Sequence, residues 1–238
     1  MTLAMEGRDS TPATARGEAT RALILDAAEQ LFARHGINGV SLRTIVTSAG
    51  VNTAAIHYHF GSKDGLVEAV FARRAIPIAE ERLRLLAACR EAPGRAPLLE
   101  QILHAFVAPT MRGPHIKEYA RLRASMVADS SPFVASLFGK YFDRSTGRFL
   151  VTLKAAVPDL PEKDLYWRLH AMLGAMVYPL ANPGRLARLT AGAFDPSDTE
   201  EALGQLVPLL AHMFRAPPPA ASPSAAHQED RTENGQPT

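Results

Sequence analysis

A short stretch near the N-terminus, residues 41–66, holds the side chains best suited to contact a polyanion. No Asp or Glu occurs between Gln30 and Lys63, although the 238-residue chain has 24 acidic residues. A surface that approaches phosphates must avoid carboxylates, because each carboxylate repels them. The positive or ionisable side chains of this acid-free stretch include Arg34, Arg43, His57, His59 and Lys63. The pattern predicts binding to nucleic acid.

Short polar side chains in the same stretch provide hydrogen-bond partners for phosphate oxygens, and these are Ser41, Thr44, Asn52 and Thr53. Ser41 is a good N-cap for a short helix, Ala49-Gly50-Val51 forms a tight turn, and a further helix runs from about Thr53 to Phe60. The apolar residues that can face inward and hold these helices together are Ile45, Val46, Ala49, Val51 and Ile56. One face of the helix after the turn is then free to enter a major groove, so the stretch predicts a helix-turn-helix.

The segment from about Thr20 to Phe71 resembles the DNA-binding domain of the TetR family of bacterial regulators. The resemblance covers the first helix, the helix-turn SLRTIVTSAGV, the recognition-helix end IHYHF and the opening GSKDGL of the fourth helix. Two positions depart from the family pattern. Val46 stands where the family usually has Ala, and His57 stands where Tyr is commonest.

The resemblance implies a role for each residue of the DNA-binding set. Ser41 and Thr44 would contact backbone phosphates, and Arg43 would reach a base, because an Arg can bond to O6 and N7 of guanine together. The residues that open the recognition helix against the groove would be Asn52, Thr53, Ala54 and Ala55. The residues that clamp phosphates would be Tyr58, His59 and Lys63, with His57 making a contact that differs in strength or pH dependence from that of the usual Tyr.

The elements that position these residues have the apolar spacing of helices throughout. The sequence predicts an all-α fold of about nine helices, with no convincing strand and with a kink or break at Pro77. We expect a flexible arm over 1–19, a helix-turn-helix domain over 20–70 and a ligand-binding and dimerisation domain over 71–215. Residues 216–238 begin APPPAASPSAA, a composition that favours disorder.

By the same resemblance, the C-terminal domain would hold a ligand pocket and a dimer interface formed by the last two helices. Candidate pocket residues are Tyr119, Arg123, Met126, Phe133, Phe138, Trp167, His170 and Met176. For any one of them, packing in an ordinary core is the more usual role. Arg123 is the exception, because an Arg on an apolar face needs a partner and could meet an acidic ligand. The expected effector is small and largely hydrophobic, with room for an acidic or hydroxyl group.

Apolar stripes on the last two long helices supply the candidate dimer interface. The residues are Gly174, Val177, Leu203, Leu206, Val207, Leu210 and Met213. Gly174 allows close approach of another helix, which fits a dimer seam or packing inside one subunit. A dimer is expected because two recognition helices must meet successive major grooves.

Other features of the chain exclude several classes of protein. The only cysteine is Cys89, and His57 and His59 point to nearly opposite sides of a helix, so we expect no metal and no cofactor. The N-terminus lacks a signal-peptide pattern and no apolar run is long enough to span a bilayer, which predicts a cytoplasmic protein that does not contact a membrane. No catalytic motif is present, so the chain is not expected to be an enzyme.

The sequence therefore predicts a ligand-responsive regulator that binds double-stranded operator DNA as a homodimer and is released by a small molecule. One alternative is a DNA-binding protein of the same fold that needs no effector, of the nucleoid or division type. A helical adaptor is the other.

Overall fold

The computed structural model describes residues 12–90, 98–113, 115–127, 131–195 and 198–218. Within these ranges the chain forms ten helices and no strand, which confirms the all-α prediction and adds one helix to the expected nine. The helices are α1 (Pro12–His35), α2 (Leu42–Ala49), α3 (Thr53–Phe60), α4 (Lys63–Arg90), α5 (Leu99–Met111), α6 (Ile116–Val127), α7 (Pro132–Ala156), α8 (Glu162–Ala181), α9 (Pro183–Leu189) and α10 (Thr199–Arg215).

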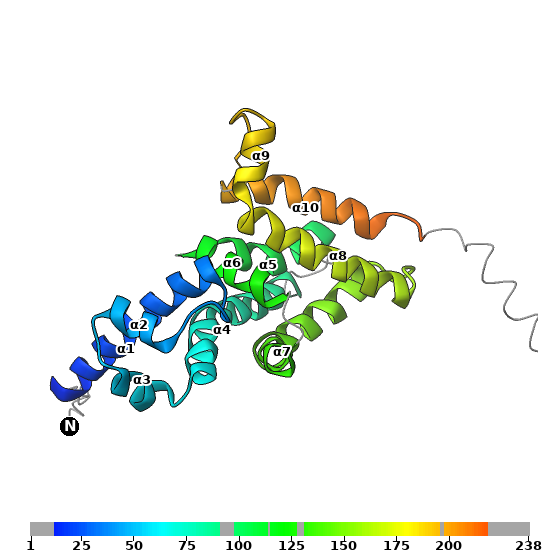
Figure 1. Cartoon of the computed structure of the whole chain (residues 1–238). Coiled ribbons are helices and arrows are strands. Elements are labelled where there is room, and N and C mark those ends of the chain that lie inside the picture. Colours follow the sequence, from blue (N-terminus) through cyan, green and yellow to red (C-terminus); the bar gives the residue numbers. More distant parts are fainter. Residues whose placement is uncertain (1–11, 91–97, 114, 128–130, 196–197, 219–238) are drawn as a thin grey trace, which may run out of the picture.

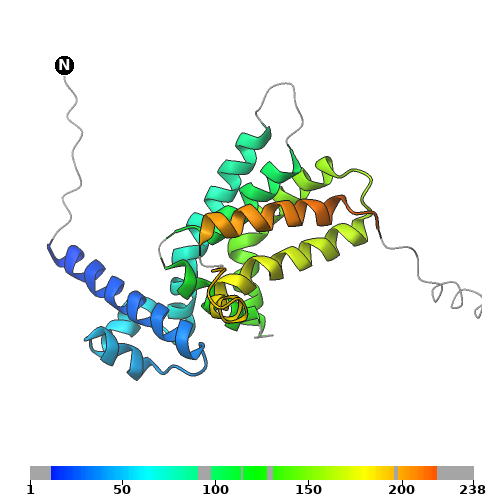
Figure 2. The ribbon, with the colours of Figure 1, turned by 90° about the horizontal axis from the view of Figure 1, so that it is seen from above.

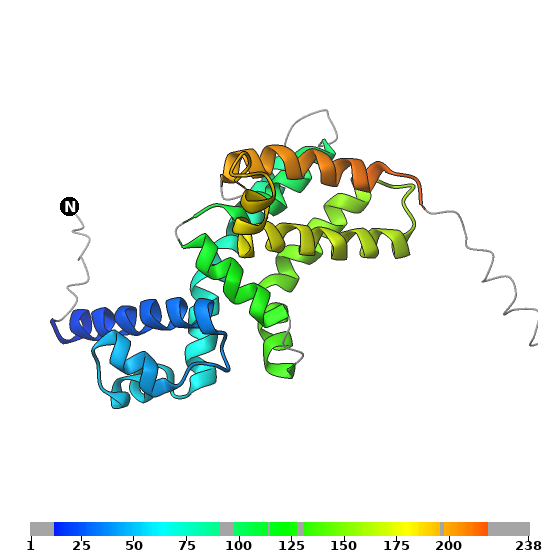
Figure 3. The same cartoon turned by 45° about the horizontal axis from the view of Figure 1, so that its top comes forward.

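The first three helices and the start of α4 form a small unit at one end of the molecule, and α4 leads from it into the larger helical body (Figure 1). In the larger body, α4 packs against α5 and α7, and α10 packs against α5 and α8. The long axes of α8 and α10 run side by side in two further views (Figures 2 and 3).

Two expectations about the ends and the long helix change with the structure. Helix α1 begins at Pro12, so residues 12–19 of the expected flexible arm are helical. Helix α4 runs from Lys63 to Arg90 through Pro77, so the expected break is absent. A proline removes one hydrogen bond from a helix, and the buried residues Ala75, Ile78 and Leu86 hold both halves of α4 in the core. Most of the expected disordered tail lies outside the described residues.

Two apolar clusters form the core. One lies within the larger body and includes Phe106, Phe149 and Phe214. The other begins in the small unit, with Ile24, Phe32 and Ile45, and continues without interruption into α6 and α7. The small unit is therefore packed on the larger body rather than joined to it by a loose linker.

Candidate DNA-binding face and ligand cavity

Side-chain caps fix the start of α2 and of α3. Ser41 Oγ accepts a hydrogen bond from the Thr44 backbone N–H at 3.1 Å, and Asn52 Oδ1 accepts one from the Ala55 N–H at 3.0 Å. Between the helices, Gly50 takes a φ of 68°, a left-handed conformation that glycine adopts at little cost. Local interactions thus fix where each helix starts and how the chain turns between them.

The inward faces of α2 and α3 join the core that the sequence predicted. Ile45, Val46 and Ile56 are buried, and Ala49 and Val51 pack against them. Helix α1 covers both α2 and α3 from behind. The opposite face of the pair is therefore left to solvent.

The outward face presents most of the predicted DNA-binding set. The exposed members are Ser41, Arg43, Thr44, Asn52, Thr53, Ala54, His57 and Tyr58, and the half-buried members are Ala55, His59 and Lys63. Tyr58 is 84% exposed, an unusual degree of exposure for a large aromatic side chain, and its ring meets only the edge of the His59 ring among the described rings. This face lies at the end of the molecule away from α8 and α10 (Figure 1).

The departure at His57 has a structural consequence. Its Nδ1 lies 3.1 Å from the Gly61 carbonyl oxygen and donates to it, because a carbonyl can only accept. The remaining ring nitrogen, Nε2, can donate to a phosphate only when the imidazole is protonated. The tyrosine that is common at this position in the family would donate from its hydroxyl without a proton being added.

Two arginines of α1 beside this face were not predicted. Arg16 and Arg21 are exposed, and the Arg21 guanidinium lies 5.3 Å from the centre of the Phe60 ring at the end of α3. The helix backbone at Gly17 also comes close to His59. The sequence gives little signal for this role, because Arg16 and Arg21 are isolated and Glu18 lies between them.

A cavity of about 620 Å³ opens between α6, α7 and α8, with α4 at its base. Four of the predicted pocket residues line it, namely Arg123, Met126, Phe138 and His170. Lining residues that sequence reasoning missed include Arg82, Val134, Phe142, Asp143 and Leu173. A volume of this size suits a small organic molecule.

The other four predicted pocket residues do not line this cavity. Tyr119 lies beneath it against the Phe71 ring, and Phe133 packs at the edge of the core. Met176 belongs to the buried face of α8, whereas Trp167 is on the other face and 67% exposed. All four have the apolar character of a pocket residue, but the rotation of each helix directs them elsewhere.

The predicted dimer stripe on α10 faces its own subunit. Leu203, Leu206, Val207 and Leu210 are buried against α5 and α8, and Met213 is half-buried beside them. Val177 lines the cavity, as does the exposed Gly174. The stripe is therefore core, because an amphipathic terminal helix first covers the body on which it lies.

The apolar residues of these helices that do face solvent differ from the predicted ones. On α8 they include Trp167 and Tyr178, and on α10 they include Leu209, which is 63% exposed. Gly174 lies on the exposed side of α8, between Trp167 and Tyr178. An apolar surface of this kind on two adjacent helices is typical of an interface with another protein chain.

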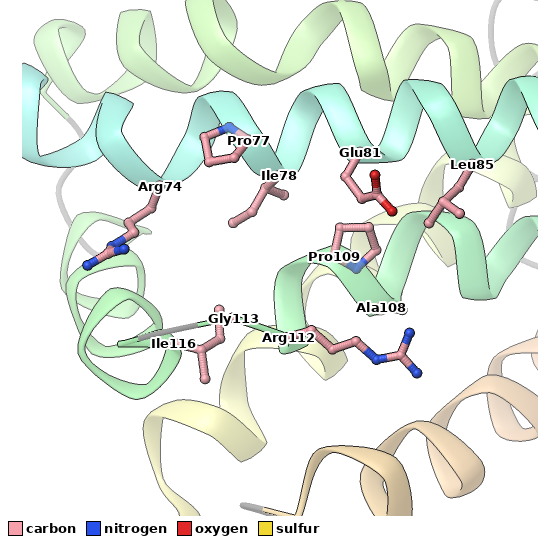
Figure 4. A pocket seen from close by; sticks show the side chains of 10 residues that line it. All are labelled: Arg74, Pro77, Ile78, Glu81, Leu85, Ala108, Pro109, Arg112, Gly113 and Ile116. Carbon is pink, nitrogen blue, oxygen red and sulfur yellow. The ribbon is translucent and has the colours of Figure 1, made fainter.

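A second cavity of about 430 Å³ lies where α4 meets the end of α5 and the start of α6 (Figure 4). Its charged lining residues each have an ion-pair partner elsewhere in the fold. Arg74 binds Glu29 through two hydrogen bonds, Glu81 binds Arg84, and Arg112 binds Glu200. These side chains need no ligand to satisfy their charge.

Within the described ranges, no three potential ligand side chains come together in a way that could hold a metal ion. No described helix is long and apolar enough to cross a membrane.

Two family models match this chain. The model described as bacterial regulatory proteins of the tetR family matches residues 24–70, and the model described as tetracyclin repressor-like, C-terminal domain, matches residues 102–213. The matched segments are the small unit with the DNA-binding face and the body with the cavity, and together they cover more than half of the chain.

Curated relatives match over part of the chain. The HTH-type transcriptional repressor BepR of Brucella suis biovar 1 (strain 1330) is 37% identical over 86 residues, which is 36% of this chain and 40% of that protein. The HTH-type transcriptional regulatory protein RaaS of Mycobacterium tuberculosis (strain ATCC 25618 / H37Rv) is 52% identical over 48 residues, which is 20% of this chain and 22% of that protein. The matches thus span less than half the length of these relatives.

Solved structures share the fold over most of the chain. The TetR family transcriptional regulator PfmR from Thermus thermophilus has a TM-score of 0.58 at 16% identity, over 89% of this chain and all of that one (100%). HlyIIR, a hemolysin II transcriptional regulator, has a TM-score of 0.58 at 19% identity, over 82% of this chain and 98% of that chain. At such identities the likeness concerns the fold alone.

Proposed function

Since this chain belongs to the TetR family of bacterial regulatory proteins, we propose that it is a ligand-responsive transcription regulator, a repressor that a small molecule releases from operator DNA. The observation that carries this proposal is the exposed, acid-free face of α2 and α3. Residues 20–70 act as the DNA-binding domain, and residues 71–215 bind the ligand and the second subunit. A regulator of this kind works beside the chromosome, in the cytoplasm, and carries out no chemical reaction.

On the DNA, α3 enters the major groove and its N-terminal residues Thr53, Ala54 and Ala55 face the base edges. Arg43 is the best placed side chain to read a guanine, because it is exposed and makes no ion pair within the described residues. Tyr58, His59 and Lys63 contact phosphates on the flank. Asn52 and Ser41 act mainly as helix caps that keep α2 and α3 in register.

A homodimer supplies the second recognition helix. Two half-sites on one side of B-DNA are about 34 Å apart, a distance that a single small unit does not span. The exposed face of α8 and α10, with Trp167, Tyr178 and Leu209, supports dimerisation at this surface. This surface takes the place of the predicted interface residues Leu203, Leu206, Val207 and Leu210, which are buried inside the subunit.

The cavity and the DNA-binding unit share one packed core. The Phe71 ring of α4 lies 5.3 Å from the Phe138 ring and 5.9 Å from the Phe142 ring, both of which line the cavity. Phe71 also belongs to the cluster that contains Ile45 and Ile56. A ligand that moves α7 relative to α4 can therefore change the spacing of the two recognition helices, by an amount set by its differential affinity for the two states.

The proposal is tested by selecting duplex DNA from a random pool with the full chain and measuring the affinity of the selected sequence. We expect a two-fold symmetric site with half-sites about one helical turn apart. Binding that shows no sequence preference would favour the alternative of a nucleoid-type protein, and no binding at all would favour a helical adaptor.

A further inference from the structure

The cavity between α6, α7 and α8 contains a buried cation without a partner. Arg123 is 6% exposed, and its Nε and Nη1 atoms have no hydrogen-bond partner among the described residues. Its guanidinium instead lies among the rings of Tyr119, Phe138 and Phe142, at 5.3 to 5.8 Å from their centres. Burial of a charge whose donors lack acceptors is unfavourable, so the fold keeps Arg123 at a penalty.

A second buried guanidinium stands beside it. Arg82 is 2% exposed and donates to the Phe106 carbonyl at 2.9 Å and to Thr110 Oγ1 at 2.6 Å, which are both neutral acceptors. Burial, followed by the nearby charge of Arg123, lowers the pKa of Arg82 to about 9. The same Phe142 ring lies 5.2 Å from the Arg82 guanidinium. The base of the cavity thus concentrates positive charge.

No carboxylate of the described residues neutralises this pair. Glu29 is buried, and its charge helps to raise the pKa of the nearby Tyr119, but Arg74 already binds its carboxylate. Asp143 lines the cavity, but it is exposed and makes no described ion pair with either arginine. Within the part of the chain that the structure describes, the charge of these two arginines is therefore not balanced, and a bound anion would balance it.

The rest of the cavity is mostly apolar. Its lining includes Met126, Val127, Val134, Phe138, Leu173 and Val177. Apart from the two arginines, the polar lining residues are Asp143, Thr146, His170, Tyr178 and Asn182. This lining suits one charged group on an apolar body, since a sugar phosphate or nucleotide needs many more polar contacts.

We propose that the effector is an amphipathic carboxylate, whose acid group binds Arg123 beside Arg82 and whose apolar body fills the space between α6, α7 and α8. The role of this ligand as an effector rests on the proposed function. The anion site itself rests only on the geometry around Arg123. A forked guanidinium binds a carboxylate through two parallel N–H···O bonds, and such bonds are among the stronger ones in proteins.

The test compares carboxylates with neutral molecules of the same shape. Calorimetry on the full chain without DNA measures binding of 2-naphthoate against 2-naphthamide, and of decanoate against decanamide. We expect at least one carboxylate to bind about tenfold or more tightly than its amide, the usual gain from a charge-assisted pair.

Two arginine variants locate the acid group. Arg123→Met keeps a long apolar side chain and should reduce the preference for carboxylate over amide to about twofold or less. Arg121→Met is the matched control on the same helix, because Arg121 is exposed and does not line the cavity. It should leave the preference unchanged.

The outcomes separate the two proposals. If neither carboxylate binds better than its amide, or if Arg123→Met keeps the full preference, the anion site is disproved even where the chain binds its selected DNA. If the carboxylate preference is present and depends on Arg123 but the chain selects no DNA, the site stands and the proposed function fails.

Discussion

At the scale of single residues, Arg43 is the side chain whose removal should most affect DNA recognition. It is exposed on α2 and supports no part of the core. Arg43→Ala should lower the affinity for the selected site by about 1–3 kcal/mol and relax the preference at one base pair. Competition gel shifts measure both effects. Arg144→Ala, an exposed change on α7, serves as the control, and equal affinity of the two variants would remove Arg43 from the base contacts.

Lys63 should act differently, because it lies at the start of α4 and is proposed to contact a phosphate rather than a base. Lys63→Ala should weaken binding to all sequences by a similar factor and reduce the slope of log affinity against log salt by about one unit. Titrations at several salt concentrations, on selected and unrelated DNA, check this. A loss of sequence preference instead would mean that Lys63 contacts a base.

The buried arginines predict opposite changes in stability. Arg123→Met removes a buried charge that lacks a partner and should raise the free energy of unfolding by about 1–3 kcal/mol without ligand. Arg82→Met leaves the Phe106 carbonyl and the Thr110 hydroxyl without their donor, and should lower it by about 1–3 kcal/mol. Urea unfolding monitored by circular dichroism measures both. A destabilised Arg123→Met would imply that Arg123 has a structural role.

The sequence could predict Arg123 but not Arg82, although their spacing gives similar signals. Arg123 follows Tyr119 by four residues and stands out on an apolar face. Arg82 also lies four residues from Ile78 and from Leu86, but an arginine on a long helix usually extends its charged end to solvent. Only the packing of α5 and α7 over this part of α4 shows that Arg82 is enclosed.

At the scale of the elements, helix periodicity predicts an apolar stripe but not the surface that it covers. The stripe of α10 was predicted with correct spacing, and the structure uses it inside the subunit. The cap at Ser41 and the turn at Gly50 were predicted correctly, because they depend on neighbouring residues alone, and the Asn52 cap, which was not predicted, is of the same local kind. Which face of a helix is buried depends on the helices that pack against it, and the exposure of Trp167 on α8 is an example.

The exposed side of α10 gives a test of the dimer. Leu209→Asp places a charge on the proposed interface and should convert the dimer to a folded monomer, since an apolar contact is replaced by a carboxylate that must stay hydrated. Sedimentation at micromolar concentration measures the mass. Leu206→Asp, three residues earlier and buried, should instead unfold the subunit. A Leu209→Asp variant that still dimerises would place the interface elsewhere.

At the scale of the whole molecule, the two functions meet at Phe71. Its ring contacts Tyr119, Phe138, Tyr141 and Phe142, which belong to the helices that surround the cavity, while its own helix begins in the DNA-binding unit. Two sites are coupled when both favour the same one of two packed arrangements. The aromatic cluster around Phe71 is the part of the core that both sites share.

Phe71→Leu should therefore weaken the coupling more than either binding event. The smaller side chain loosens the contact with Phe138 and Phe142, so the ligand moves α7 with less effect on α4. Affinity for the selected DNA without ligand, and affinity for 2-naphthoate or decanoate without DNA, should each change by less than about threefold. The ratio of DNA affinities without and with ligand should fall toward one, from the roughly 5- to 150-fold that is typical of allosteric regulators.

Phe214→Leu is the matched control, because it removes the same atoms from a buried site in the other cluster and should cost similar stability while leaving this ratio intact. If Phe71→Leu keeps the full ratio, the signal does not pass through this aromatic contact, and the path through α1 and α6, which also pack together, becomes the better account.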